Sequence, residues 1–271
     1  MSTDGLIVLE VEDLSKHFGG LAALSDYRLD LARNDVLGLI GPNGAGKTTA
    51  FNLLTGVLAP TGGRIRLAGA DLAGVGPEAF ASAGIARTFQ NIRLFRDLTV
   101  WENVAVGLHM RQGPGWLATI LGLPGAVARE GEIRDRSAAL LADLGLADAV
   151  DRRAGDLPYG LQRKVEIARA LATAPTVLLL DEPAAGMNPS ETAALTETLR
   201  GIASAADAPT LIVVEHDMKL VMSLCSRVQV LNRGLLIADG KPADIQRHED
   251  VIAAYLGSGR RSRKGRRHAH A

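Results

Sequence analysis

Short apolar runs recur along this chain and are separated by segments in which apolar residues follow a helical spacing. Residues 36–40, 176–180 and 210–214 are apolar at almost every position. Runs of this length without polar alternation are typical of strands that are buried on both faces of a sheet. Since helical segments lie between them, the pattern predicts an α/β fold whose sheet is mostly parallel. Further strands are expected at residues 7–11, 27–31, 64–67 and 84–88.

The middle of the chain has a different pattern. From residue 99 to residue 172 the apolar positions follow helical spacing, and residues 163–171 place Ala, Leu and Ile on one face. We interpret residues 91–172 as a helical subdomain inserted into a single α/β domain of residues 1–256. The α/β pattern then resumes, with a helix expected at 191–204. A closing hairpin is expected from residues 227–231 and 235–238 around the turn Asn232-Arg233-Gly234.

The compartment is indicated by three further features. The longest mixed apolar stretch, residues 116–128, is interrupted by Gly122 and Pro124, so it is too short for a transmembrane helix. The acidic N-terminus lacks the basic and then apolar pattern of a secretion signal. Cys225 is the only cysteine, which excludes an internal disulfide and a cysteine-based metal site and fits a reducing cytoplasm.

Charge is distributed unevenly, although the formal net charge is zero. The last segment, residues 258–271, contains six Lys or Arg and no acid, so the rest of the chain carries 24 basic against 30 acidic residues. Contact with anionic lipid or nucleic acid is one interpretation of this segment. Because it lacks large apolar residues and cannot fold alone, we favour a disordered solubilising tail from residue 257 onward.

A phosphate-binding loop follows the apolar run at residues 36–40. The pattern G-x-x-x-x-G-K-[ST] is met by Gly41, Gly46, Lys47 and Thr48. Glycines allow successive backbone N–H groups to wrap phosphate oxygens, and a helix that begins near Lys47 adds the positive end of its dipole. The strand before the loop and the helix after it favour this function over a merely structural glycine-rich turn.

The loop therefore predicts a nucleoside triphosphate bound together with Mg²⁺. Lys47 can reach the β- and γ-phosphates as a point charge, and the Thr48 hydroxyl suits a Mg²⁺ ligand. The residues expected to contact the nucleotide here are Gly41, Pro42, Asn43, Gly44, Ala45, Gly46, Lys47, Thr48 and Thr49.

Two carboxylates, Asp181 and Glu182, end the apolar run at residues 176–180. Acids at the end of so apolar a strand are costly unless the site needs them. We expect Asp181 to hold Mg²⁺ through water and Glu182 to polarise the attacking water. A helix N-cap would account for one acid but not for both.

The segment at residues 157–162, Leu-Pro-Tyr-Gly-Leu-Gln, precedes a helical run. With it, residues 6–256 resemble the ATP-binding subunits of ABC transporters, and the segment stands where that family has its L-S-G-G-Q signature. The resemblance implies a P-loop NTPase core of the ABC-ATPase type, with a mostly parallel sheet, an antiparallel β part and an inserted helical subdomain. It also implies that ATP bound by the opposite protomer is faced by Pro158, Tyr159, Gly160, Leu161 and Gln162.

Other elements of the family occur in the expected order. Phe18 matches the aromatic residue that stacks on adenine, and His216 matches the switch histidine that contacts the γ-phosphate. Gln90 matches the glutamine that senses Mg²⁺ and the attacking water and that abuts the membrane partner, so it is expected at both the catalytic and the metal site. Residues 184–189 occupy the loop that crosses the dimer. The resemblance thus implies catalytic roles for Glu182, His216 and Gln90.

Three residues depart from the family pattern. Pro158 replaces the usual signature serine and Leu161 the usual glutamine, so a hydroxyl contact to the γ-phosphate is missing. Backbone N–H groups near Tyr159 and Gly160 would have to substitute for it. Asn188 replaces the usual aspartate of the loop that crosses the dimer. None of these departures removes the expected base or metal ligands.

The resemblance implies a cytoplasmic ATPase subunit that dimerises around two ATP molecules and drives a separate integral membrane permease. The second ATPase is an identical chain or a paralogue, and an extracytoplasmic solute-binding protein is an indirect partner. Helices after Gln90, including residues 95–106, are expected to receive the permease. The protein is expected at the cytoplasmic face of the inner or plasma membrane as a peripheral subunit, with no nucleic-acid partner.

Several motifs, at residues 84–95, 186–189 and 214–218, are most similar to the branched-chain amino-acid importer branch of the family. Importers of amides or urea share much of these motifs and remain an alternative. A soluble ABC-type ATPase of DNA repair or translation usually carries a coiled coil or two fused cassettes. A regulatory module that binds ATP without turnover is disfavoured by the presence of Glu182 and His216.

Overall fold

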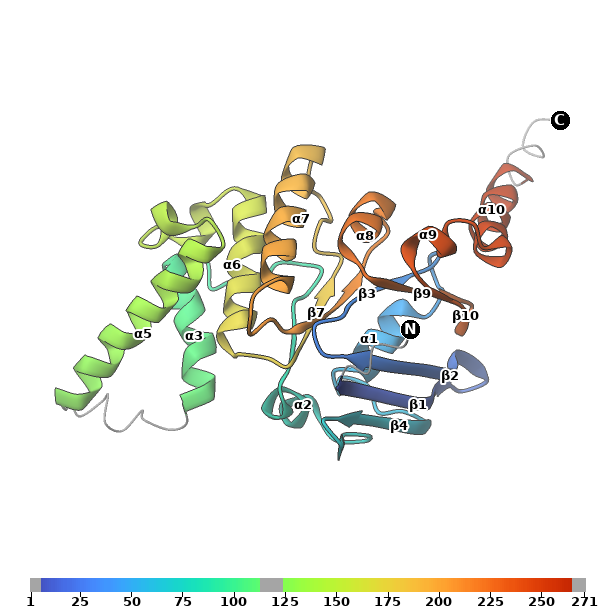
Figure 1. Ribbon diagram of the computed structural model, residues 1–271, viewed down its shortest axis with the longest axis horizontal. Helices are drawn as coiled ribbons and strands as arrows, with labels where there is room; N and C mark the ends of the chain where they lie inside the picture. Colours follow the sequence, from blue (N-terminus) through green and yellow to red (C-terminus); the bar gives the residue numbers. More distant parts are fainter. Residues whose placement is uncertain (1–5, 113–123, 265–271) are drawn as a thin grey trace.

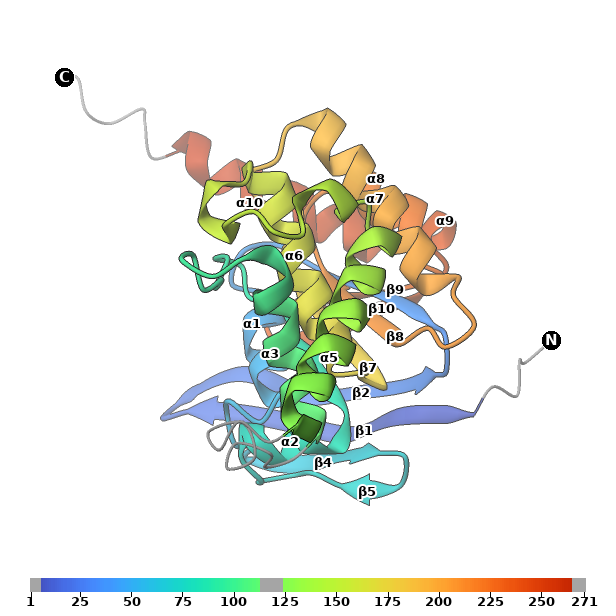
Figure 2. The same ribbon diagram turned by 90° about the vertical axis from the view of Figure 1, so that its left-hand side faces the viewer.

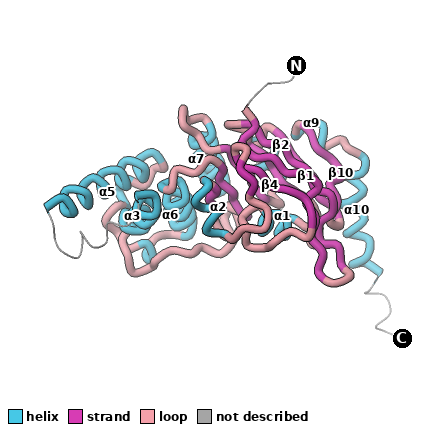
Figure 3. Tube along the Cα trace, turned by 90° about the horizontal axis from the view of Figure 1, so that it is seen from below, coloured by secondary structure: helices cyan, strands magenta, loops and turns pink. Residues whose placement is uncertain are grey.

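Two β-sheets stack with helices around them, and a group of helices extends to one side (Figure 1). The computed structural model describes residues 6–112 and 124–264. The helical group consists of α3 (Val100–Gln112), α5 (Pro124–Asp143) and α6 (Tyr159–Ala172), which lie alongside one another in Figure 2. Seen from below, the strands lie toward the opposite end of the molecule from this group (Figure 3). The segment of helical spacing in the sequence thus forms a lateral part of the fold.

The larger sheet has six strands among the described residues, in the order β10-β9-β3-β8-β7-β6. Its strands are β3 (Val36–Ile40), β6 (Ile85–Arg87), β7 (Val177–Asp181), β8 (Thr210–Val214), β9 (Arg227–Asn232) and β10 (Leu235–Gly240). All neighbouring pairs are parallel except β9 and β10, which form an antiparallel hairpin. The predicted mostly parallel sheet and its closing hairpin are both confirmed.

The smaller sheet is antiparallel and has the order β2-β1-β4-β5. Its strands are β1 (Ile7–Phe18), β2 (Leu21–Ala32), β4 (Gly62–Leu67) and β5 (Ala70–Asp71). The first two are longer than the strands predicted at residues 7–11 and 27–31. Pairing shifts register between Val11 and Leu14, and Asp13 adopts a φ of 48°. Such irregularities disrupt the alternation of apolar and polar residues, so periodicity underestimates the length of the strand.

The hydrophobic core lies on both faces of the larger sheet. On one face, helix α1 (Lys47–Leu53) packs with residues of both sheets, and its Phe51 is fully buried. The other face packs against α7 (Pro189–Ala203) and α8 (Met218–Leu224). Leu179 of β7 joins the first cluster, whereas Leu178 and Leu180 join the second. Burial on both faces explains why these strands are continuous apolar runs.

Helix α6 lies at the boundary between the helical group and the larger sheet. Its Val165 and Ala168 pack with residues of α3 and α5 in a separate core cluster. Its Ile167 instead packs in the cluster on the face of the larger sheet that is covered by α7 and α8. Any displacement of α6 therefore disturbs contacts with both parts of the fold.

The remaining helices are α2 (Pro77–Ala83), α9 (Pro242–Ile245) and α10 (Glu249–Lys264). Helix α10 extends to Lys264, and the disordered tail expected from residue 257 onward stays a prediction. Acidic residues in its first turn favour a helix through its dipole. Residues 113–123 and 265–271 lie outside the described residues, and so do most of the apolar stretch at 116–128 and the end of the basic tail. None of the helices described is long and apolar enough to span a membrane.

Candidate nucleotide-binding and catalytic site

The predicted phosphate loop lies between the end of β3 and the start of α1, as the sequence indicates. Two of its glycines are required by close backbone contacts. At Gly41, where φ is 150°, a Cβ atom would lie 2.2 Å from the Leu231 carbonyl oxygen. At Gly46, where φ is 105°, it would lie 2.7 Å from the Ala23 carbonyl oxygen. Side chains at these positions would displace the loop from the strands that support it.

Lys47 folds back onto the loop that precedes it. Its Nζ donates hydrogen bonds to the carbonyl oxygens of Gly41, at 2.7 Å, and Pro42, at 3.2 Å. The residue is 9% exposed. Burial lowers the pKa of its ammonium, and the Glu182 carboxylate opposes that shift. A partly desolvated cation at the first turn of a helix is well placed to attract phosphate.

A cavity of about 620 Å³ opens over the loop. Its lining includes loop residues Asn43 to Thr49 and, on other walls, Glu182, Arg233 and Gly234. Ligand pockets of proteins typically measure about 300–1,000 Å³. Thr48, Lys47 and Glu182 therefore face one space of the size that a nucleotide's phosphates need.

Phe18 ends β1 and is 48% exposed, with the Lys16 Nζ 5.3 Å from its ring centre. It does not belong to the lining of the cavity, although Leu21 and Ala22 of the following strand do. An exposed ring beside the mouth of the cavity is compatible with stacking on a planar base.

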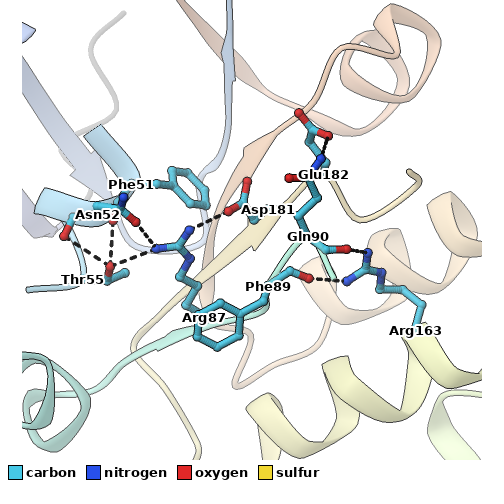
Figure 4. A network of polar contacts seen from close by, with 9 residues as sticks. All are labelled: Phe51, Asn52, Thr55, Arg87, Phe89, Gln90, Arg163, Asp181 and Glu182. Atoms are coloured by element: carbon cyan, nitrogen blue, oxygen red, sulfur yellow. Dashed lines mark hydrogen bonds and ion pairs between the residues drawn. The ribbon is translucent and has the colours of Figure 1, made fainter. Parts of the chain in front are cut away.

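The two acids at the end of β7 have separate partners, both shown in Figure 4. The Asp181 carboxylate accepts a hydrogen bond from Arg87, with 2.6 Å between Nη2 and Oδ2. The Glu182 Oε2 accepts one from the Gln90 amide at 2.7 Å. Glu182 has a φ of 43°, a conformation that few residues other than glycine and asparagine adopt readily. The structure thus brings the predicted base and the predicted sensor glutamine into direct contact.

Arg87 is a residue of this site that the sequence did not single out. Besides Asp181, its guanidinium donates to Asn52 Oδ1 of helix α1 at 2.7 Å. It also lies 5.5 Å from the Phe51 ring centre and 5.3 Å from that of Phe89. It therefore ties the helix after the phosphate loop to the predicted metal carboxylate. No local spacing could have shown this, since Arg87 and Asp181 are 94 positions apart.

His216 follows β8 and is exposed, with 68% of its side chain accessible. Its Nδ1 lies 4.0 Å from Glu182 Oε1 and 3.9 Å from Glu215 Oε2. The structure thus places the predicted switch histidine next to the predicted base. An exposed imidazole at this place can turn toward a ligand in the cavity.

Glu215 is the second residue that sequence reasoning missed. It is buried, and its carboxylate accepts hydrogen bonds from the backbone N–H groups of Ala184 at 2.8 Å and His216 at 3.1 Å. Burial raises the pKa of this carboxyl, and these hydrogen bonds oppose the shift. Its bonds join the loop after Glu182 to the segment that carries His216.

The signature segment begins helix α6 and does not line the phosphate-loop cavity. Pro158 is the N-cap of α6 and supplies no side-chain cap. Tyr159 is exposed, and Gln162 turns inward, where its Nε2 donates to the Leu157 carbonyl oxygen at 2.8 Å. A Cβ atom on Gly160 would meet only the Glu191 side chain, at 3.6 Å or more. Within one chain, Gly160 is therefore not required by packing.

Asn188, the departure in the loop that crosses the dimer, has a local role. Its side chain accepts hydrogen bonds from the N–H groups of Ser190 and Glu191, and the Glu191 side chain accepts one from the Asn188 N–H. This capping box starts helix α7. Asparagine serves this purpose as well as aspartate, so the departure leaves the loop's anchor intact.

The residues present fit a magnesium ion held jointly with phosphate oxygens. No cluster of three or more His, Cys, Asp or Glu side chains within residues 6–112 and 124–264 could hold a metal. Mg²⁺ at nucleotide sites usually takes one or two protein ligands and completes its shell with phosphates and water. The Thr48 hydroxyl and the free oxygen of Asp181 are donors of the kind that it prefers.

Comparisons with known proteins agree with this geometry. A family profile described as "ABC transporter" matches residues 24–185, and one described as "Branched-chain amino acid ATP-binding cassette transporter" matches residues 236–260. The chain is 44% identical over 250 residues to the high-affinity branched-chain amino acid transport ATP-binding protein LivG of Escherichia coli (strain K12), covering 92% of this chain and 98% of that protein. The corresponding protein BraF of Pseudomonas aeruginosa gives the same identity and coverage.

Among solved structures, the ADP conformation of an ATP-binding cassette of an ABC transporter superposes with a TM-score of 0.80. It is 30% identical, and the match covers 93% of this chain and 99% of that one. The family profile, the relatives and the fold agree with the phosphate loop and its acid pair. The chain therefore belongs to the ABC transporter family of ATP-binding proteins.

Proposed function

We propose that this protein hydrolyses ATP to drive the uptake of branched-chain amino acids through a separate membrane permease. The observation that carries the hydrolytic part is the contact of Glu182 with Gln90 at the wall of the phosphate-loop cavity. The choice of solute rests on the match at residues 236–260 and on the similarity to LivG and BraF. Importers of amides or urea are the alternative.

In this proposal the phosphates enter the cavity over the loop at the start of α1. Lys47 exchanges its loop carbonyl partners for phosphate oxygens, and the first N–H groups of α1 contribute the positive end of the helix dipole. The Thr48 hydroxyl and the Asp181 carboxylate would hold Mg²⁺. Bound there, the ion would neutralise developing negative charge on the phosphates. Arg87 keeps one oxygen of Asp181 occupied and so orients the other.

Glu182 acts as the general base toward the attacking water. A carboxylate in hydrogen-bond reach of the water can polarise its O–H bond as the oxygen attacks the γ-phosphate. The Gln90 amide donates to Glu182 and so orients the carboxylate. In this proposal His216, which is exposed and next to Glu182, contacts the γ-phosphate.

A second copy of an ATPase subunit completes each site. Residues 158–162 lie at the N-terminus of α6, where the N–H groups of Leu161 and Gln162 donate to the Pro158 carbonyl oxygen. The N–H groups of Tyr159 and Gly160, at the first turn of the helix, are the ones we expect to face an anion. These residues do not line the cavity of their own chain, and Gly160 leaves room for close approach to a ligand. The signature therefore serves the nucleotide bound by the partner, which is an identical chain or a paralogue.

The permease docks on the helical group, near the segment after Gln90. Phe95, Leu98 and Met110 are exposed apolar residues of this region. Exposed apolar side chains are the kind of surface that a protein contact buries. In this proposal the protein lies at the cytoplasmic face of the membrane as a peripheral subunit.

The test is reconstitution of the complex from detergent-solubilised membranes. The tagged chain should copurify an integral membrane protein, and liposomes with this complex and its binding protein should take up leucine, isoleucine or valine when ATP is supplied inside. The Glu182→Gln variant is the matched control, because it should assemble the same complex without uptake. Uptake of urea or amides in preference to these amino acids would replace the proposed solute. Copurification of nucleic acid without a membrane protein would refute the transport function.

A further inference from the structure

Helix α6 carries a charged pair that is almost completely buried. The side chains of Arg163 and Glu166 are 0% and 1% exposed, and 2.7 Å separates Nη1 of Arg163 from Oε2 of Glu166. Removing two charges from water is costly, and their mutual attraction offsets this cost only if further hydrogen bonds satisfy both groups. The hydrogen-bond partners of Arg163 and Glu166 therefore indicate the role of the pair.

Those partners all lie in the segment that carries Gln90. Arg163 donates from Nη1 to the carbonyl oxygen of Phe89 at 2.6 Å and from Nη2 to that of Gln90 at 2.7 Å (Figure 4). Glu166 Oε1 accepts a hydrogen bond from the Arg93 N–H at 3.3 Å. The pair thus holds both ends of residues 89–93 against α6.

Gln90 is consequently held from two directions. Its backbone carbonyl is bound to Arg163 of α6, and its side-chain amide donates to Glu182 at the end of β7. Arg163 stands one helical turn after Tyr159, the first residue of α6 in the signature segment. The first turn of α6 therefore carries the signature residue Tyr159 at its start and, one turn later, Arg163, which binds the Gln90 segment.

We propose that Arg163, oriented by Glu166, is a positioning residue that couples the place of the signature helix to the contact between Gln90 and Glu182. A shift of α6, as when the signature meets the partner's nucleotide, moves the carbonyls that Arg163 holds and with them the Gln90 amide. The base is then oriented only when α6 is in place. The inference rests on the proposed function, since it takes Glu182 as the base and Gln90 as its orienting neighbour.

Arginine suits this position because its planar fork can hold several oxygens in fixed directions. Two carbonyls and one carboxylate are bound by its two terminal nitrogens here. Lysine would offer a single nitrogen on a flexible stem and could not hold the same three oxygens in this geometry. Lysine should therefore keep the charge balance with Glu166 but loosen Gln90.

The experiment is a mutant cycle on the ATPase of the full chain. The first variant is the paired replacement, Arg163→Met with Glu166→Leu, which leaves no unpaired buried charge. The second variant is Gln90→Ala. The third variant combines the paired replacement with Gln90→Ala. We expect kcat to fall roughly tenfold to hundredfold in each of the first two variants, as expected for a misplaced reacting group, with KM for ATP little changed. The kcat of the combined variant should be no more than about twofold below that of the slower of the first two variants, because both changes remove the same orientation of Glu182.

Lys164→Met is the matched control, since it removes another partly buried cation from α6 whose Nζ donates to the Leu144 carbonyl oxygen and not to the Gln90 segment. Its effect, whatever its size, should multiply with that of Gln90→Ala. If the paired replacement does not melt cooperatively, Arg163→Lys takes its place. We expect Arg163→Lys to lower kcat by a smaller factor, and to lower it no further in a protein that already carries Gln90→Ala.

The outcomes separate the two levels of the proposal. Multiplicative effects of the Arg163 and Gln90 variants would overturn the coupling and leave the role of Gln90 intact. An unchanged kcat in Gln90→Ala would overturn that role, and the coupling with it. An unchanged kcat in a folded Arg163→Lys variant and in the paired replacement would refute the positioning role of Arg163.

Discussion

Replacement of Lys47 by alanine gives the most direct test of the phosphate site. In the structure its ammonium is 9% exposed and donates to the Gly41 and Pro42 carbonyl oxygens. These neutral acceptors hold the cation at the loop until phosphate oxygens replace them. The substitution therefore removes a charge-assisted contact in the complex and two hydrogen bonds in the free protein.

The magnitude follows from these contacts. Hydrogen bonds to charged groups contribute roughly 1.5–3 kcal/mol. This corresponds to a Kd for ATP about 10- to 150-fold higher. The free protein should lose about 1 kcal/mol of folding stability. This is the low end of the cost of leaving a buried acceptor unpaired, because water in the cavity can reach the Gly41 and Pro42 carbonyl oxygens. For a chain of this size that lowers Tm by roughly 2–4 °C, so the variant stays folded at assay temperature.

The assay is equilibrium dialysis with Mg²⁺ and ATP, with thermal melting of each sample. Lys241→Ala is the matched control, because this exposed residue precedes α9 and does not line the cavity. It should bind ATP as the unaltered protein does. A Kd for the folded Lys47→Ala protein within about twofold of the control would refute the assignment of Lys47 to the phosphates.

Four further predictions test the site and the fold. Glu182→Gln should retain ATP binding, lose nearly all turnover and accumulate as an ATP-bound dimer in size-exclusion chromatography; turnover at the normal rate would show that Glu182 is not the base. Gly160→Asp monomers should bind ATP normally, and mixing them with Lys47→Ala protein should recover part of the ATPase activity; folded Gly160→Asp monomers that cannot bind ATP would contradict a site shared between protomers. Tyr27→Phe should lower the free energy of unfolding by about 1–3 kcal/mol in urea titration, because the buried Tyr27 hydroxyl donates to Gln229 Oε1 at 2.6 Å, and an unchanged midpoint would contradict this. The Cys225 thiol, whose pKa burial raises to about 12, should resist alkylation in the folded protein from pH 7 to pH 9 and react on unfolding, whereas rapid native labelling would show that it is accessible.

The sequence alone determined the features whose signal lies in consecutive residues. The phosphate loop is readable because glycines, Lys47 and Thr48 act at fixed spacing between a strand and a helix. The strands of the larger sheet are readable because burial on both faces demands continuous apolar runs. Asp181 and Glu182 stood out because two acids end one of those runs. The lengths of β1 and β2 were not readable, since register shifts interrupt their periodicity.

Only the tertiary structure decided which polar groups hold these residues in place. Arg87 meets Asp181 across 94 positions, and Arg163 meets the Gln90 carbonyl across 73. An arginine carries no local sign of which oxygen it will bind, because its long side chain fits many environments. Its partners are chosen when the sheet brings β6 beside β7 and α6 packs against them. Local sequence motifs therefore identify the residues that carry the chemistry of the site. The contacts that orient these residues arise from strand order and helix packing.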